Sequence, residues 1–333
     1  MHSYSLWILY SNDGSSSVKS PLYGRRTGQW KIESFPFHLF HHIFPNHSFE
    51  ARLQFFSILD GIPAYIKKMN NKKSVPWNLK HKIFKKGEYL YEEAENLLRQ
   101  ELRTPRNYNA ILQAIAERYN KFGEISNRTE FSKSLLSQYL KNLQKLHVIK
   151  KNFPITQQKE SRNARYILSD NYFSFWFQFV YPYQQLIEQD RQILLLESIA
   201  DKLTKQYSFT FEQICQQLIQ QESYTKVGTW WNKNEEIDVV ALDELHEHVL
   251  FGECKWTKKK IGTTILDDLQ KKSDHVTWKK GRRKEGFVLF SKSGFTDTLI
   301  EEGKKNKEIN LFDQNDIDVF FQNQSRNFIK RKD

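Results

Sequence analysis

The sequence predicts a multidomain α/β protein, with a mainly helical part followed by a C-terminal part built on a small sheet. Residues 87–149 show almost continuous helical periodicity, with apolar side chains recurring every three or four positions. Residues 236–242 and 249–256 are two apolar segments separated by a polar turn, as in a pair of neighbouring strands. At 333 residues, the chain is long enough for two or three domains.

Charge and cysteine content narrow the classes of function. Lysine and arginine total 51 against 39 acidic residues, a formal net charge of +12. This excess favours a polyanionic partner, most simply DNA, although a basic solvated surface without a partner gives the same composition. The two cysteines, Cys215 and Cys254, have neither metal-finger spacing nor the density of a disulfide framework. Because there is no apolar run of about 18 residues and no secretory signal at Met1–Tyr10, we expect a cytoplasmic protein that does not enter a membrane.

The first predicted elements are a strand and two helices. Residues 5–10 are apolar and aromatic and run into a polar turn, which indicates a buried strand. Residues 49–59 show helical patterning and are followed by glycine and proline, which end helices. A charged amphipathic helix is expected at 88–103, stopped by Pro105.

The next region has the element order of a winged helix-turn-helix. Three segments with helical periodicity precede two short apolar segments that suit a β-hairpin. These elements together make up that fold, which we place at residues 105–170. The predicted helices and strands span residues 107–119, 124–128, 132–146, 148–151 and 164–168.

The helix at 132–146 would be the recognition helix of this module. Lys133, Gln138, Lys141 and Asn142 are its outward candidates for contacts with DNA. The helix is not conspicuously basic, so packing of the module against its neighbours, without DNA, is an equally good interpretation.

A very aromatic segment follows at residues 170–182. We interpret it as a buried hinge rather than as a stacking platform for bases, because its aromatic residues are contiguous and not interleaved with basic ones. Residues 183–205 are predicted to form a connecting helix.

The C-terminal strands carry the residues that indicate chemistry. Because side chains alternate along a strand, Glu253 and Lys255 point to one face and Cys254 points to the other. Asp238 lies on the preceding strand, so two carboxylates and one ammonium group are expected to meet at one end of the sheet. Burying such charges is costly unless they pair or bind a metal. Hard oxygen ligands suit Mg²⁺ or Mn²⁺, and a nearby lysine can orient or deprotonate the attacking water in phosphodiester hydrolysis.

These residues also have a simpler interpretation. Charged residues at strand ends are commonly solvated, and a surface ion pair between neighbouring side chains contributes almost nothing to stability. However, groups of basic residues flank the site, where phosphates would need neutralising. They include Lys258, Lys259, Lys271, Arg282 and Arg283.

The spacing of the site residues resembles the PD-(D/E)XK nuclease superfamily, whose signature is an aspartate followed by Glu-X-Lys on the next strand. The matching positions are Asp238, Glu253 and Lys255. The resemblance also implies a polar residue on the helix that follows, for which Gln270 and Lys271 are the candidates.

The resemblance implies a role for each residue. Asp238 and Glu253 would hold Mg²⁺ or Mn²⁺, with the backbone carbonyl of Cys254 as a third ligand. Lys255 would position the attacking water. Glu212, expected on the helix before the sheet, would hold a second metal ion or orient Lys255.

Several sequence blocks in the same order resemble archaeal and bacterial ATPases of the AAA-related STAND class that end in a PD-(D/E)XK-like domain. The blocks lie at residues 20–29, 61–65, 90–93 and 169–177 and continue through the strands of the site. The resemblance implies a remnant of the ATPase core, a helical lid-like segment, the winged helix, an aromatic linker and a nuclease-like domain. Their boundaries would be 1–48, 49–104, 105–170, 171–206 and 207–333.

The sequence departs from that family at its N-terminus. The family begins with a phosphate-binding loop, and no G-x-x-x-x-G-K-[ST] sequence occurs here. Without it, there is no backbone cradle for the β- and γ-phosphates. Ser15 and Ser16 match a sensor region and Arg25 and Arg26 match the nucleotide region, but we expect neither tight ATP binding nor ATP hydrolysis. The chain resembles an N-terminally truncated member of the family.

The leading hypothesis from the sequence is a DNA-associated protein with a metal-dependent deoxyribonuclease site. One alternative is a non-catalytic module that binds DNA or a protein through the winged helix and the basic C-terminal domain. Another is one part of a split ATP-binding STAND ATPase, whose missing half is another polypeptide. A homo-oligomer is a further expectation for its partners.

Overall fold

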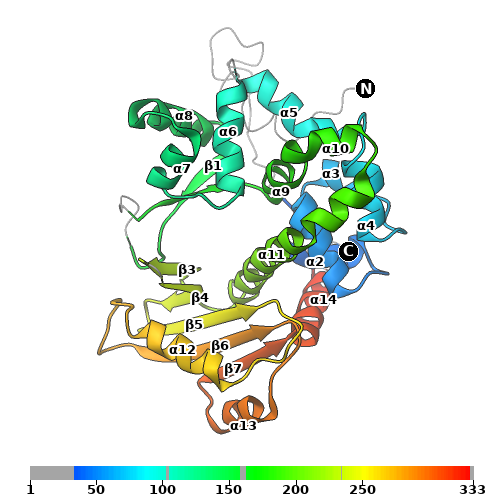
Figure 1. Ribbon diagram of the computed structural model, residues 1–333. Helices are drawn as coiled ribbons and strands as arrows, with labels where there is room; N and C mark the ends of the chain where they lie inside the picture. Colours follow the sequence, from blue (N-terminus) through cyan, green and yellow to red (C-terminus); the bar gives the residue numbers. More distant parts are fainter. Residues whose placement is uncertain (1–33, 103–104, 158–162, 234, 331–333) are drawn as a thin grey trace, which may run out of the picture. The chain divides into compact units, whose positions relative to one another are not determined.

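The structure is a computed structural model that describes residues 34–102, 105–157, 163–233 and 235–330 and divides into two compact units (Figure 1). The first unit groups Phe55–Asn152 and Arg165–Ala200 with residues 34–36. The second unit groups Phe37–Gln54, Phe153–Ala164 and the chain from Asp201 onward. The second unit is therefore assembled from segments that are far apart in the sequence.

The segment predicted to be the last strand of an ATPase core lies outside the described residues. The same is true of the sensor candidates Ser15 and Ser16 and of Arg25 and Arg26. The described residues that follow form a 3₁₀-helix, η3 (Phe37–Leu39), and a short helix, α1 (Phe40–Ile43).

Helix α2 (Phe49–Leu59) has the predicted bounds. The helix is followed by Asp60, whose φ of 52° is left-handed, and then by Gly61. A Cβ on Gly61 would lie 1.9 Å from the carbonyl oxygen of Phe35, so only glycine fits there. The buried Asp60 carboxylate accepts hydrogen bonds from the backbone N–H groups of Gly61 at 2.7 Å and Asn171 at 3.0 Å. Within the first unit, this carboxylate ties the end of α2 to a later helix.

Three short helical elements and one longer helix lie between the turn at Gly61 and the winged helix. The longer one, α5 (Tyr89–Glu101), buries Leu90, Ala94 and Leu97 on one face, as its amphipathic sequence predicts. The others are α3 (Pro63–Ile66), α4 (Val75–Asn78) and the π-helix η4 (Leu79–Ile83).

The winged helix-turn-helix is confirmed as three helices and a two-stranded hairpin. Ser132 caps the third helix by accepting the backbone N–H of Leu135, and Leu136, Leu140 and Leu143 bury one face of it. Its elements are α6 (Pro105–Ala116), α7 (Phe122–Thr129), α8 (Lys133–Lys145), β1 (Ile149–Asn152) and β2 (Arg165–Leu168), with the two strands antiparallel.

The aromatic segment forms a core helix of the first unit, α9 (Asn171–Phe179). Its aromatic side chains are buried, and the indole of Trp176 donates to the carbonyl of Tyr91 at 2.8 Å. The hydroxyl of Tyr172 donates to the carbonyl of Leu90, also at 2.8 Å. The segment is buried, as predicted, and it packs inside one unit instead of serving as a hinge.

A short 3₁₀-turn, η5 (Tyr181–Tyr183), and α10 (Gln184–Glu188) lead to the long helix α11 (Gln192–Ile219). The residues of α11 from Asp201 onward belong to the second unit. No helix in the described ranges has the length and apolar composition needed to span a membrane.

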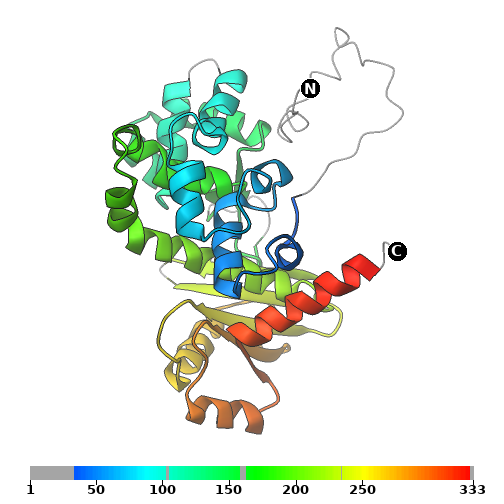
Figure 2. The same ribbon diagram turned by 90° about the vertical axis from the view of Figure 1, so that its right-hand side faces the viewer.

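The second unit contains a five-stranded mixed sheet in which the spatial order of the strands equals their order in the chain. The first three strands pair antiparallel, and the last three pair parallel through helical connections. Helix α12 covers one face of this sheet (Figure 1), and α14 runs from the last strand toward the C-terminus (Figure 2). The elements are β3 (Lys226–Asn232), β4 (Glu235–Asp243), β5 (His248–Lys255), α12 (Thr263–Ser273), β6 (Lys284–Ser291), α13 (Asp297–Lys305), β7 (Ile309–Asp313) and α14 (Gln314–Lys330).

One hydrophobic cluster holds α12 and α13 against the sheet. Leu266 and Leu269 of α12 and Leu299 of α13 belong to it, together with Val249 and Phe251 of β5. The side chains of β5 alternate, so the positions two and four residues beyond Phe251 continue on the face that α12 covers. Those positions are the predicted site residues.

Candidate active site

The sheet brings together the acidic residues that the sequence predicts to meet. Asp238 lies on β4, and Glu253 and Lys255 lie at the end of the neighbouring β5. In this antiparallel pair, Val239 lies opposite Gly252, which places Asp238 next to Glu253. A Cβ on Gly252 would lie 2.8 Å from Val288 Cγ1 and 2.9 Å from Val239 Cβ. The close packing of three strands beside the site therefore depends on this glycine.

Asp238 sits at an irregularity of the sheet. The register between β3 and β4 shifts between Gly228 and Trp230, where β4 has an extra residue opposite Thr229. The carbonyl of Asp238 accepts a hydrogen bond from Gln216 Nε2 of α11 at 2.7 Å and a longer one from Thr229 Oγ1 at 3.4 Å. A bulge changes the direction of a side chain relative to the regular alternation of a strand. Here the hydrogen bonds from Gln216 and Thr229 hold the backbone of the bulge at Asp238.

The Asp238 carboxylate points at β5. Its Oδ2 accepts the backbone N–H of Cys254 at 2.9 Å. This bond holds the carboxylate at the residue between Glu253 and Lys255. The predicted convergence of the two acids and the lysine is therefore present in the structure.

Glu253 is the centre of a charged cluster. It is 6% exposed, and its Oε1 accepts Lys255 Nζ at 2.6 Å. Lys272 of α12 donates to both carboxylate oxygens, at 3.2 Å to Oε1 and 3.0 Å to Oε2. Glu253 thus lies between two ammonium groups that are each only about one quarter exposed, 29% for Lys255 and 26% for Lys272.

The crowding of charge changes the pKa values of the site. Burial and the nearby Glu253 carboxylate raise the pKa of Asp238 to about 7, against the opposing effects of the Cys254 N–H and Lys255. Burial alone would lower the pKa of Lys255, but the two carboxylates outweigh it and raise that pKa above its ordinary value. Lys255 is therefore charged at neutral pH, whereas Asp238 titrates there.

Cys254 points to the opposite face of the sheet from Glu253 and Lys255, as predicted. Its thiol lies beside that of Cys215 on α11, and neither forms a disulfide. Burial raises the pKa of both thiols. The two cysteines fill the contact between α11 and the sheet as protonated, apolar side chains.

Glu212 lies on α11, on the helix before the sheet, as the resemblance implies. Its charge acts on both thiols, Cys215 and Cys254. Among the described residues, no three or more histidines, cysteines, aspartates or glutamates are grouped so that they could hold a metal ion. The acidic residues that the described part of the structure brings together at the ends of β4 and β5 are Asp238 and Glu253.

On the following helix, for which Gln270 and Lys271 are the predicted candidates, the side chain that contacts Glu253 is that of Lys272. Lys271 is exposed and its ammonium lies 3.5 Å from Asp268, away from the site. Helical periodicity could have found Lys272, because it follows the buried Leu269 by three positions and so lies on the face that packs on the sheet.

Most of the basic residues predicted to flank the site are exposed. They are Lys258, Lys259, Lys271 and Arg282. On α8, Lys133, Gln138 and Lys141 are also exposed. Asn142 is partly buried and donates to the hydroxyl of Tyr108 at 2.9 Å.

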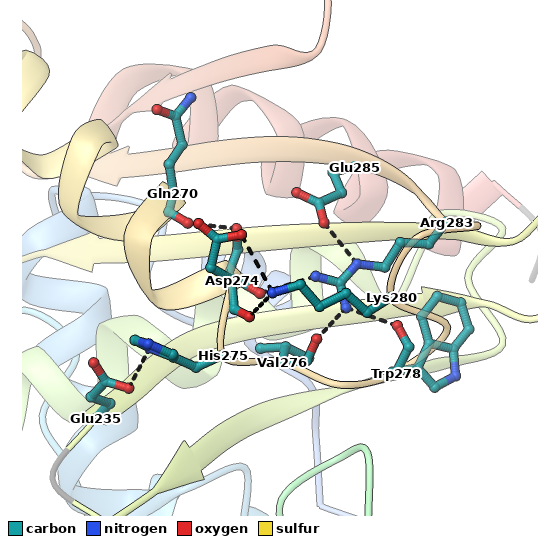
Figure 3. A network of polar contacts seen from close by, with 10 residues as sticks. Glu235, Gln270, Asp274, His275, Val276, Trp278, Lys280, Arg283 and Glu285 are labelled. Carbon is teal, nitrogen blue, oxygen red and sulfur yellow. Dashed lines mark hydrogen bonds and ion pairs between the residues drawn. The ribbon is translucent and has the colours of Figure 1, made fainter.

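Arg283 is buried, in contrast to its predicted place among the basic residues that flank the site. Its side chain is 1% exposed, and its guanidinium pairs with Glu285 at 2.7 Å (Figure 3). It also donates to three backbone carbonyls, those of Ser273 at 3.0 Å, Trp278 at 2.8 Å and Val276. These contacts fasten the end of α12 to the start of β6. Arg283 is a structural residue and does not belong to an exposed basic surface.

Comparisons with known proteins match two segments of the chain. Residues 109–151, from α6 to β1, match the family described as "Bacterial regulatory protein, arsR family". Residues 176–267, which include Glu212, Asp238, Glu253 and Lys255, match the family described as "Archaea bacterial proteins of unknown function". The first match agrees with the winged helix seen in the structure.

An uncharacterized protein of Methanocaldococcus jannaschii is 34% identical over 271 residues, which are 78% of this chain and 61% of that protein. The chain thus spans less than two thirds of the length of this relative. No solved structure matches the chain. The comparisons show an arsR-type helix-turn-helix and a segment similar to an archaeal and bacterial family of unknown function, and they show no nuclease or ATPase family.

Proposed function

We propose that this protein binds DNA through its winged helix and hydrolyses phosphodiester bonds at the Asp238, Glu253 and Lys255 site with the help of a divalent cation. The observation that carries the proposal is the meeting of Asp238, Glu253 and Lys255 at neighbouring positions of β4 and β5. There, burial and the Glu253 carboxylate raise the pKa of Asp238 to about 7. Groups whose pKa is displaced this far are concentrated at functional sites. The order of a helix, three antiparallel strands, a helix and a parallel strand around the site also suits the nuclease-like fold that the sequence resembles.

The donor set fits a hard divalent cation. Asp238 and Glu253 would hold it, because both offer carboxylate oxygens and their mutual repulsion is relieved by a positive charge. Two carboxylates are sufficient for Mg²⁺, which commonly keeps several waters and takes further ligands from substrate phosphates. When bound, the cation supplies a Lewis acid that polarises a phosphoryl oxygen.

The protein's own residues have distinct tasks in this proposal. Lys255 keeps its proton at neutral pH because both carboxylates raise its pKa, so it acts as a hydrogen-bond donor and positive charge toward the phosphate. It is not the base. Asp238 in its ionised form is held in place by the N–H of Cys254 and the bulge contacts to its carbonyl. Lys272 orients Glu253 through both oxygens.

A cleavage assay tests the hydrolytic part. The full chain is incubated with labelled single- and double-stranded DNA and Mg²⁺ or Mn²⁺, beside Asp238→Asn and Lys255→Met. The controls are Asp267→Asn and Lys304→Met, which replace exposed residues of α12 and α13. We expect cleavage by the wild type and both controls and none by the two site variants. Cleavage that survives both site substitutions contradicts the proposal.

Equilibrium binding tests the DNA-binding part separately. Phosphate contacts release counterions, so each lysine lost from the interface lowers the dependence of log Kd on log salt by about 0.9. We expect Lys133→Ala with Lys141→Ala to weaken binding of a fluorescent duplex and to reduce that dependence, measured by anisotropy over a salt series. Lys205→Ala, an exposed lysine of α11, is the control. Equal curves for the double variant and the wild type remove α8 from the interface.

One observation favours a non-catalytic DNA-binding protein as the second candidate. Both oxygens of Glu253 already accept hydrogen bonds from lysines in this structure. A self-contained ion cluster would stabilise the domain without a cation. Salt-dependent binding of DNA together with no cleavage under any metal condition would select this candidate.

A further inference from the structure

A second charged cavity lies in the second unit, separate in its residues from the carboxylate site. It has a volume of about 470 Å³ and lies between α1, the start of α2 and α14. Figure 2 shows α1, in dark blue, beside α14, in red. The charged and titratable residues of its lining are His41, His42, His47, Arg52, Asp318 and Arg326.

Asp318, the one carboxylate among the described lining residues, is already paired with positive groups. Asp318 accepts Arg52 Nη2 with both oxygens, at 2.8 and 2.9 Å, and His41 Nε2 lies 3.0 Å from its Oδ1. Burial alone would raise the pKa of Asp318, but these hydrogen bonds lower it on balance. Asp318 therefore stays ionised, and it holds the buried Arg52 in a fixed orientation.

Positive groups remain after this pairing. Arg326 is exposed and makes no ion pair with any other residue in the described part of the chain. The imidazole of His42 is exposed on the same cavity, and that of His47 is partly buried there. The guanidinium of Arg52 has its Nε buried without a hydrogen-bond partner among the described residues. Among its described lining residues, the cavity thus offers arginine guanidinium groups and imidazoles, and its one carboxylate is already paired.

The start of α2 adds backbone donors to the same wall. Ser48 lines the cavity, and its hydroxyl accepts the N–H of Ala51 at 3.3 Å, which makes it the N-terminal cap of an 11-residue helix. The first turn of a helix presents unpaired N–H groups and the positive end of the helix dipole, an arrangement that favours anions. The backbone N–H groups of α2 therefore add to the attraction that the arginine side chains of the lining exert on an anion.

We propose that this cavity binds the dianionic phosphate of a phosphomonoester. The guanidinium of Arg326 can meet phosphate oxygens in a planar, two-pronged geometry, and the imidazoles of the lining add further donors. The volume lies within the range of about 300–1,000 Å³ that is typical of small-molecule sites. A concave pocket suits a phosphate at the end of a molecule. Such a phosphate belongs either to a mononucleotide or to a 5′-phosphorylated DNA strand. The inference does not depend on the hydrolytic function proposed above.

Calorimetry on the full chain tests the proposal, with EDTA present so that no cation occupies the carboxylate site. The probes are inorganic phosphate, a 5′-mononucleotide, a 5′-phosphorylated oligonucleotide and the same oligonucleotide with a 5′-hydroxyl. We expect the phosphomonoesters to bind at least tenfold more tightly than the 5′-hydroxyl strand. Tighter binding of the mononucleotide or of the phosphorylated strand identifies the source of the phosphate. The proposal is overturned if phosphate and both phosphomonoesters fail to bind at millimolar concentration.

Substitutions locate the binding. Arg326→Gln and His42→Gln replace exposed residues, so both variants should fold, which thermal melting checks. Each should weaken binding of the phosphomonoester about tenfold, because each removes a hydrogen-bond donor to the phosphate and Arg326→Gln also removes a positive charge. Arg191→Gln, an exposed arginine of the first unit, should bind with the affinity of the wild type. Binding that is unchanged in both cavity variants would place the phosphate elsewhere and contradict the proposal.

Discussion

Lys272 on α12 donates to both carboxylate oxygens of Glu253 on β5, at 3.2 and 3.0 Å. This contact joins the helix that covers the sheet to the acid at the centre of the site. It also places an ammonium group beside the carboxylate of Glu253. A divalent cation at Glu253 would have to share this carboxylate with Lys272 or displace it.

Replacing Lys272 by methionine should increase the affinity for Mn²⁺ about tenfold, because the competing ammonium is removed and Glu253 keeps its charge. Without metal, the variant should be less stable by about 1–3 kcal/mol, since a buried acceptor loses its charged donor. Isothermal titration with Mn²⁺ and urea denaturation measure the two effects. Lys271→Met is the control, because the ammonium of Lys271 makes only an exposed 3.5 Å contact. An unchanged Mn²⁺ affinity would show that Lys272 and the metal do not compete.

The pKa of Asp238 predicts a specific pH dependence of stability. The folded state raises this pKa from its ordinary value of 3.8 to about 7, so between these values the folded protein binds a proton that the unfolded chain has lost. Stability from this group is therefore present below about pH 4 and declines as pH rises toward 7. At about 1.4 kcal/mol per unit, the full cost above pH 7 is up to about 4 kcal/mol.

Asp238→Asn removes this cost, so it should be more stable than the wild type at pH 8 by up to about 4 kcal/mol and should differ little at pH 4. Urea denaturation with EDTA at the two pH values measures the difference. Asp267→Asn, at an exposed position of α12, should show no such change. If the stability difference between Asp238→Asn and the wild type is the same at both pH values, the charge crowding described for the site is wrong.

Gly252 should not tolerate alanine. Its Cβ would lie 2.8 Å from Val288 Cγ1 and 2.9 Å from Val239 Cβ, inside the contact distance of both strands. We expect Gly252→Ala to cost about 1–3 kcal/mol through overpacking and to separate Asp238 from Glu253. Gly228→Ala is a matched control in the same sheet, because its Cβ would meet Ile155 at an ordinary 3.6 Å. Equal stability of the two variants in urea denaturation would contradict the packing argument.

The two thiols should be inert in the folded protein. Cys215 is 0% exposed and Cys254 is 4% exposed, and burial raises the pKa of both. A colorimetric thiol reagent such as DTNB should therefore give no signal with native protein and two equivalents after unfolding in guanidinium. Rapid labelling of either cysteine before unfolding would show that α11 does not stay packed on β5.

Sequence patterns predicted the local elements well where the periodicity was strong. Helix α2 has the predicted ends, and the three helices and hairpin of the winged helix appear in the predicted order. Strand β3 is not among the predicted elements, because Gly228 and a register shift interrupt its alternation. The aromatic helix α9 was predicted to be buried, but its place in the core of one unit depends on partners distant in the sequence.

For the predicted site residues too, local sequence indicated exposure correctly only where no distant segment packs on the side chain. Exposure of Lys258 and Lys259 agrees with what a charged surface segment predicts. Arg283 has the same local sequence character, yet it is buried because carbonyls at the end of α12 happen to surround it. No local pattern distinguishes these lysines from that arginine.

Alternation along β5 was sufficient, from the sequence alone, to put Glu253 and Lys255 on one face and Cys254 on the other, because the direction of side chains in a strand has a period of two. The tertiary structure alone decided that a bulge in β4 aims Asp238 at the N–H of Cys254 and that Lys272 closes over Glu253. It also decided the pKa of Asp238. Burial and the distance between charges arise from pairing between separate segments, and no spacing within one segment encodes them.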